Sequence, residues 1–134
     1  MIEEIQNTLD HCVEYATDLL VETGEAYPFG AFIDSIGNVH PLEMEIDKKN
    51  VPTIGKVMEH LEKFCESEMR EGNQKGYALA YEVQLQFEDR KTPTDAIAID
   101  IRHQSSQDIP IYYLPFEKTE DSAVPGEVFA VKRS

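Results

Sequence analysis

The chain has 134 residues, 41% apolar and 28% charged, as expected for one globular domain whose core needs no metal or disulfide. Its 26 acidic and 12 basic residues give a net charge of −14. This charge argues against nucleic acids and anionic membranes as partners, because both are bound through surface cations.

The first residues and the cysteines indicate a cytoplasmic protein. The segment MIEEIQNTLD is acidic, whereas a signal peptide begins with basic and then apolar residues. No apolar run approaches the roughly 18 residues needed to cross a bilayer. Cys12 and Cys65 both fall on the apolar side of predicted helices, so we expect buried, reduced thiols.

Two amphipathic helices are predicted. In residues 2–22 apolar side chains recur every three or four positions, and Gly24 can end the helix in a left-handed conformation. The same periodicity predicts a second helix at about 52–71, and Pro52 suits its first turn.

Two strands are predicted between these helices, in YPFGAFID and VHPLEMEI, with a Gly-Asn turn joining them. Leu42, Met44 and Ile46 share one face of the second strand, because side chains alternate along a strand. Pro41 cannot donate a hydrogen bond to a neighbouring strand, so this strand lies at a sheet edge or begins after the proline.

Further strands follow the second helix. In YALAYEVQLQF (77–87) and DAIAIDIRH (95–103), large apolar residues alternate with alanines and polar residues, which predicts a sheet covered on one face. IPIYYLPF and EVFAVK predict two more strands, with the polar loop KTEDSAVPG between them. The hairpins predict an α+β fold of order α-β-β-α-β-β-β(-β). We expect a single antiparallel sheet of about five to six strands with both helices packed on one face.

A strip of carboxylates lies along the first predicted helix at four-residue spacing: Asp10, Glu14, Asp18 and Glu22. The first 47 residues contain eleven acidic residues and no Lys or Arg. Like charges four residues apart on a helix repel by roughly 0.2–0.5 kcal/mol per pair. The strip is either a solvated surface that aids solubility or a docking surface for a basic partner protein, which its field would attract.

A second set of polar residues falls on the predicted hairpin. Asp100 and Arg102 point outward from one strand, and Glu82 is expected opposite them on the neighbouring strand. With Tyr112 they would line a ligand site on the open sheet face, where paired carboxylates serve acid–base chemistry. Ion pairs between the strands explain the same residues without any ligand.

Four alanines are expected together on the outward face of this hairpin: Ala78, Ala80, Ala96 and Ala98. Small side chains there let a second layer approach closely, which suggests a homodimer through this face. An ordinary exposed sheet face is the alternative.

No motif for catalysis, metal binding or a cofactor is recognised. The Gly55-Lys56 pair lacks the remaining residues of a phosphate-binding loop. No two of the four histidines have the spacing of zinc ligands (His11, His40, His60 and His103). Both cysteines lie in settings that disfavour a reactive thiolate. We therefore predict no catalytic residue, no metal and no cofactor.

The segments YPFGAFID…GNV, DAIAIDIRH and IYYLPF resemble a group of small bacterial proteins without an assigned activity. In that group a Pro-Phe-Gly/Ala strand follows an N-terminal helix, and a Leu-Pro-Tyr/Phe strand comes late. The resemblance covers most of the chain, but its motifs are structural and imply no functional residue. The element order is also similar to that of profilin-like and roadblock-like domains and of toxin immunity proteins, a likeness of topology alone.

These observations predict a non-enzymatic cytoplasmic binding protein, an adaptor or an immunity-like module, with its acidic helix towards a basic partner. The alternative is an enzyme or a small-ligand-binding domain whose site lies on the open sheet face.

Overall fold

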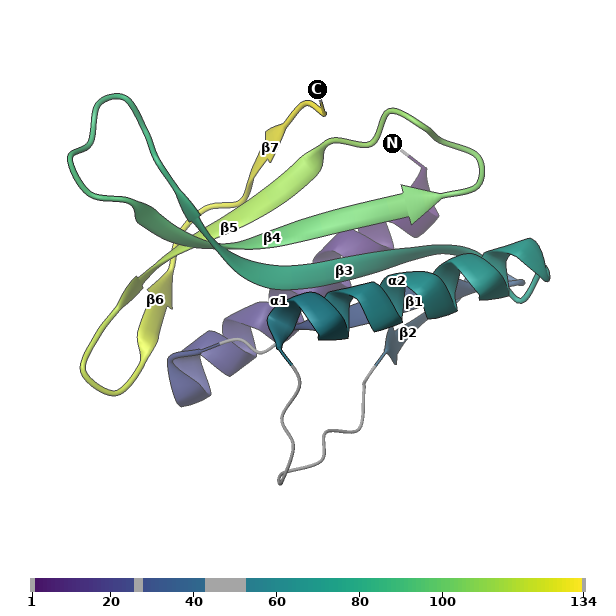
Figure 1. The fold of residues 1–134 in the computed structure, drawn as a ribbon, viewed down its shortest axis with the longest axis horizontal. Helices are drawn as coiled ribbons and strands as arrows, with labels where there is room; N and C mark the ends of the chain where they lie inside the picture. The colour runs from purple at the N-terminus through teal and green to yellow at the C-terminus, as the bar shows by residue number, and fades with distance from the viewer. Residues whose placement is uncertain (1, 26–27, 43–52, 134) are drawn as a thin grey trace.

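The computed structural model describes residues 2–25, 28–42 and 53–133, and they form two helices and one seven-stranded antiparallel sheet (Figure 1). The α+β fold and the predicted order of elements are confirmed. The elements are α1 (Glu3–Thr23), β1 (Phe29–Asp34), β2 (Val39–Leu42), α2 (Ile54–Arg70), β3 (Gln74–Leu85), β4 (Thr94–His103), β5 (Ile111–Lys118), β6 (Ala123–Pro125) and β7 (Phe129–Val131).

The ends of both helices have local causes. Gly24 ends α1 with a left-handed φ of 76°, and its N–H donates to the carbonyl of Leu20 at 2.8 Å, as predicted for a glycine at this position. Thr53 caps α2, because its hydroxyl accepts the N–H of Lys56 at 3.2 Å. Pro52, predicted in the first turn, lies outside the described residues. Neither of these helices is long and apolar enough to cross a membrane.

The strands lie in the order β2-β1-β3-β4-β5-β6, and β7 also pairs with β5. β2 is an outer strand that contains Pro41, so the proline does mark a sheet edge. Met44 and Ile46 lie outside the described residues. The loop predicted in KTEDSAVPG contains β6, a strand of three residues that extends the sheet beyond β5.

The register between β3 and β4 gives the sheet two apolar faces. Ala78 lies opposite Ile101 and Ala80 opposite Ile99, and residues directly opposite each other share a face. These residues pack under α1 with the apolar residues of that helix. Tyr77 and the other odd-numbered residues of β3 point to the second face.

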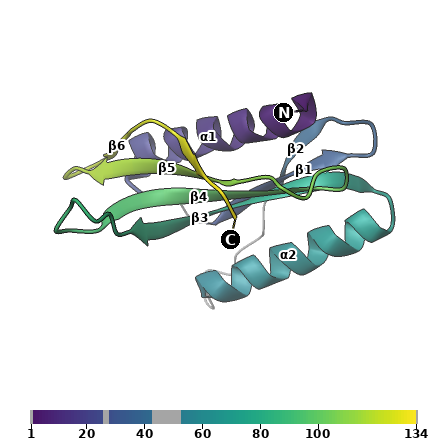
Figure 2. The same ribbon diagram turned by 90° about the horizontal axis from the view of Figure 1, so that it is seen from above.

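α2 covers part of this second face. Val57, Leu61 and Cys65 of α2 pack on Tyr77 and Leu79. Figure 2 shows α1 and α2 on opposite sides of the sheet. The prediction that both helices pack on one face is therefore wrong, because each face of the sheet carries apolar side chains that must be covered.

Both cysteines belong to these two cores. Cys12 of α1 and Cys65 of α2 are both buried on the side of their helix that packs against the sheet, and neither forms a disulfide. Burial raises the pKa of each thiol to about 12, so both stay protonated at neutral pH. They contribute packing, not a nucleophile.

The close contact between β3 and β4 is tested at Gly76. A Cβ on this residue would lie 2.5 Å from the carbonyl oxygen of Arg102, so Gly76→Ala forces the strands apart. We expect the free energy of unfolding, measured in urea, to fall by about 1–3 kcal/mol. Gly55→Ala is the matched control, because nothing lies within 4 Å of its added Cβ. It should leave stability unchanged or slightly higher, and equal losses in both variants would contradict the packing described.

Candidate functional site

The four predicted carboxylates lie exposed along the outer side of α1. Its buried residues lie on the opposite side of the helix, against the sheet. Asp10 accepts a hydrogen bond from the amide of Gln6 at 2.9 Å. Within the described ranges no Lys or Arg forms an ion pair with Asp10, Glu14, Asp18 or Glu22. The structure therefore places the predicted residues together on a surface with unbalanced charge.

This acidic strip extends into the first turn of α1. Glu3 precedes Asp10 by seven residues, and two turns of an α-helix take about 7.2, so the two lie on the same side. Glu3 is exposed and makes no ion pair with another described residue. The strip thus runs from Glu3 to Glu22 along almost the whole helix.

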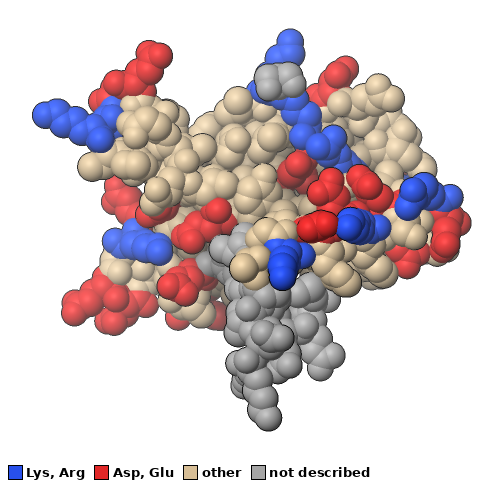
Figure 3. Space-filling view, in the orientation of Figure 1, with Lys and Arg blue, Asp and Glu red and all other residues tan. Residues whose placement is uncertain are grey.

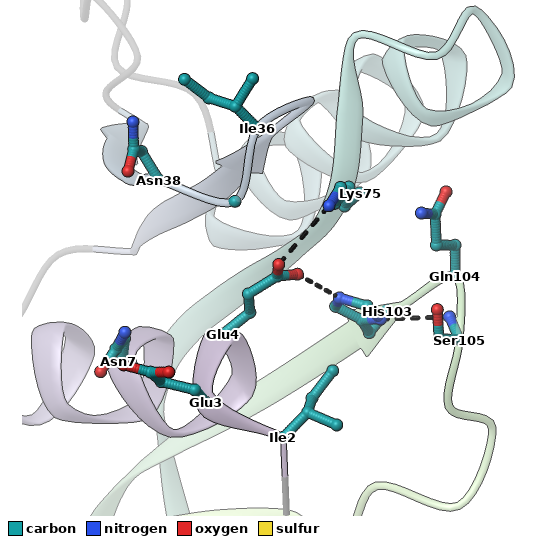
Figure 4. A pocket seen from close by; sticks show the side chains of 11 residues that line it. Ile2, Glu3, Glu4, Asn7, Ile36, Asn38, Lys75, His103, Gln104 and Ser105 are labelled. Carbon is teal, nitrogen blue, oxygen red and sulfur yellow. Dashed lines mark hydrogen bonds and ion pairs between the residues drawn. The ribbon is translucent and has the colours of Figure 1, made fainter.

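A groove of about 580 Å³ opens beside the first turn of α1 (Figure 4). Its walls come from α1, from the turn between β1 and β2, and from the start of β3 and the end of β4. The lining is mostly polar and consists of Ile2, Glu3, Glu4, Asn7, Ile36, Gly37, Asn38, Lys75, His103, Gln104 and Ser105.

Three side chains form a connected chain in this groove. The side chain of His103 is 3% exposed, and its Nδ1 accepts the backbone N–H of Ser105 at 3.1 Å. The ring proton therefore lies on Nε2, which donates to Glu4 at 2.9 Å. The second oxygen of Glu4 is 3.5 Å from the ammonium of Lys75.

The hydrogen bond from His103 lowers the pKa of the Glu4 carboxyl, and the charge of Lys75 adds to this effect while burial opposes it. Glu4 is therefore ionised at neutral pH. Both ring nitrogens of His103 form hydrogen bonds within the protein. The chain joins the first turn of α1 to β3 and β4.

The rim of the groove has unused hydrogen-bonding groups. The side-chain amides of Asn7, Asn38 and Gln104 make no hydrogen bond with another described residue. Ile2 and Ile36, which are 45% and 77% exposed, stand on either side. The groove therefore offers amides, one unpaired carboxylate and two apolar side chains next to the acidic strip.

The predicted ligand site on the sheet does not assemble. Glu82 lies opposite Ile97 on the α1 face, 3.7 Å from Lys118, and Tyr112 faces α1 as well. Asp100 and Arg102 lie on the α2 face, 3.4 Å apart. The prediction that these four share one face is wrong. In the observed register the even-numbered residues of β3 share a face with the odd-numbered residues of β4, so Glu82 faces away from Asp100 and Arg102.

The same register separates the four alanines. Ala78 and Ala80 lie under α1, whereas Ala96 and Ala98 lie opposite Val83 and Tyr81 on the other face. All four are at most 1% exposed. The prediction of one outward alanine face is therefore wrong. A homodimer stays an untested prediction, and these alanines no longer support it.

Sequence reasoning missed the contacts between distant residues. Glu4 and His103 are 99 positions apart, and no periodicity relates them. A second missed contact is local: Nε2 of His40 lies 2.7 Å from a carboxylate oxygen of Asp34, across the turn between β1 and β2. The sequence indicated only that His103 points to the strand face opposite to Arg102, and this did not identify Glu4 as its partner. No cluster of three or more metal-binding side chains occurs in the part of the chain that the structure describes.

Comparison with models of known protein families gave no match for the chain. No curated protein matches it. No solved structure matches it either. The geometry of the described residues is therefore the basis for a functional proposal.

The contact between α1 and β4 is tested with Glu4→Gln. The pKa of Glu4 is lowered in the folded protein, so its stabilisation is present above the ordinary value of 4.5 and is lost as the pH falls through the folded value. We expect unfolding in urea at pH 7 to show a loss of about 1 kcal/mol, which disappears in acid. Glu3→Gln, which removes an unpaired carboxylate, should show no such loss. A loss that persists unchanged below pH 3 would contradict the charge-dependent contact.

The repulsion within the strip is also measurable. The variant Asp10→Asn, Glu14→Gln, Asp18→Asn, Glu22→Gln removes three like-charge pairs at four-residue spacing. At low salt it should be more stable than the wild type by about 1 kcal/mol, because each pair costs roughly 0.2–0.5 kcal/mol. Salt screens exposed charges, so the difference should shrink in urea titrations at high ionic strength. A difference that does not depend on salt would exclude charge repulsion as its cause.

Proposed function

We propose that this protein is a non-enzymatic cytoplasmic binding module whose acidic strip on α1 docks onto a basic surface of a partner protein. The observation that supports the proposal is the exposure of four carboxylates on one side of a well-anchored helix, with no ion pair to any described Lys or Arg. An adaptor role and an immunity-like inhibition of a cationic toxin both use such a surface.

Physical considerations favour binding by this strip. A surface of one sign speeds the encounter with an oppositely charged protein and suppresses encounters with acidic ones. A basic partner would also relieve the repulsion between the carboxylates, so part of the unfavourable energy in the unbound helix favours association. The helix needs little reorganisation, because its other side is fixed in the core.

The groove at the start of α1 supports the same proposal. It places the exposed Ile36 and Ile2 beside the unpaired carboxylate of Glu3. An interface commonly combines a few apolar anchors with a polar rim. A basic partner that follows the strip would meet apolar contacts and amide hydrogen-bonding groups at this end of the helix.

The proposal is tested by comparing proteins captured from a bacterial lysate at low and moderate salt. The baits are the wild type and the fourfold strip variant Asp10→Asn, Glu14→Gln, Asp18→Asn, Glu22→Gln. We expect a basic protein to be retained by the wild type and lost from the folded variant, and its affinity to fall steeply with salt. Mass spectrometry identifies the protein, and calorimetry with the purified pair measures its affinity.

A second fourfold variant separates the strip from net charge. It carries Glu88→Gln, Asp89→Asn, Glu120→Gln and Asp121→Asn, which remove the same charge from two exposed loops outside α1. The captured protein should bind this variant almost as well as the wild type. If both variants lose binding of the captured protein equally, net charge and not the position of the strip determines binding. If both variants retain binding equally, the proposal is contradicted.

A further inference from the structure

A second cleft lies on the other face of the sheet, between α2 and the end of β4. Its volume is about 490 Å³, within the range of small-molecule sites. Glu62, Glu66, Met69 and Arg70 of α2 form one wall, and Tyr77 and Arg102 form the other. Figure 3 shows acidic and basic side chains gathered over α2 and the end of β4.

Tyr77 contributes a polar side chain to the lining of this cleft. The residue is 4% exposed, and its hydroxyl makes no hydrogen bond with any described residue. This oxygen is not among the buried polar atoms without a partner, so it keeps contact with solvent. The pKa of Tyr77 is raised to about 12, mainly by burial and to a smaller extent by Glu66 and Glu62, while Arg102 opposes this rise. The charges that line the cleft therefore act on the phenol, which is a protonated hydroxyl at neutral pH. A hydroxyl without a partner in the protein is available to form a hydrogen bond with a ligand or with water.

Arg102 lies directly opposite Tyr77 in the register of β3 and β4. Its Nε is 3.4 Å from Asp100, which is itself bound by Arg133. This contact holds the base of the guanidinium, whereas its two terminal nitrogens have no partner among the described residues. A guanidinium with both terminal nitrogens available binds a carboxylate through two parallel hydrogen bonds.

The helix wall has the complementary charge. Glu62 and Glu66 stand one turn apart on α2, and neither pairs with a Lys or Arg in the described part of the chain. They provide acceptors for an ammonium group. Two carboxylates facing a guanidinium make the cleft unfavourable for a simple anion, and Arg70 and Arg102 disfavour a simple cation.

We propose that this cleft binds a free α-amino acid. The carboxylate of the ligand would bind to Arg102 and the Tyr77 hydroxyl, and its ammonium would bind to Glu62 and Glu66. Met69 offers a flexible apolar contact for the side chain of the ligand. A zwitterion suits the cleft because its two charges match two walls of opposite sign. The site is independent of the acidic strip, which lies on the other face of the molecule.

The test is a titration of the ¹⁵N-labelled full chain with each of the common free amino acids, followed by NMR. At concentrations on the order of 10 mM, at least one should shift the amide resonances of Tyr77, Arg102 and Glu66 in a saturable way. The N-acetyl derivative lacks the ammonium and the amide derivative lacks the carboxylate. We expect both to bind at least about tenfold more weakly, because each loses one charged contact.

Two conservative variants locate the binding. Tyr77→Phe removes only the hydroxyl, and Arg102→Lys keeps the charge but loses the two-pronged hydrogen bond. Each should weaken binding by about threefold to tenfold with an unchanged folded spectrum. Arg90→Lys on the exposed loop between β3 and β4 is the matched control and should bind as the wild type does.

Three results would overturn the proposal. The first is the absence of saturable shifts in the cleft with every amino acid. The second is equal binding of a blocked derivative, which would remove the requirement for a zwitterion. The third is unchanged affinity in both cleft variants, which would place the ligand elsewhere. None of these results depends on the capture experiment with the acidic strip, so the two proposals can fail separately.

Discussion

The architecture of this protein depends on the register between β3 and β4. Pairing Ala78 with Ile101 and Ala80 with Ile99 places small residues of one strand beside large residues of the next on the same face. The second face receives Tyr77 and Leu79 from β3. Both faces are therefore apolar near the middle of the sheet, and each needs a helix to remove it from water. The opposite positions of α1 and α2 follow from this requirement.

The two helices leave different surfaces to the solvent. α1 contacts several strands of its face, and Glu4 also joins its first turn to His103 and Lys75. This attachment holds the acidic strip in a fixed orientation. The packing of α1 in the core stabilises the helix against the repulsion among these carboxylates. α2 mainly contacts β3, so part of its face of the sheet remains next to a polar cleft.

The two proposed sites use opposite arrangements of charge. The strip on α1 has one sign over a long surface, which suits a large basic partner and acts over a distance limited by salt screening. The cleft beside α2 sets Glu62 and Glu66 against Arg102 within a small volume, which suits a small ligand with both charges. Because the sheet separates the two sites, a substitution in one should leave the other intact.

The sequence by itself determined the features that depend on neighbours along the chain. The acidic strip from Asp10 to Glu22 and the end of the first helix at Gly24 follow from local periodicity and backbone chemistry. For Pro41 the sequence left two alternatives, an edge strand or a strand that begins after the proline, and the sheet order decided for the edge strand. Only the tertiary structure decided which strand faces coincide, and hence that Glu82 and Arg102 lie on opposite sides. It also decided which distant groups meet, such as Glu4 with His103 and Tyr77 with Arg102. The physical reason is that alternation defines the two faces within each strand, whereas a shift of one residue in register exchanges those faces between strands.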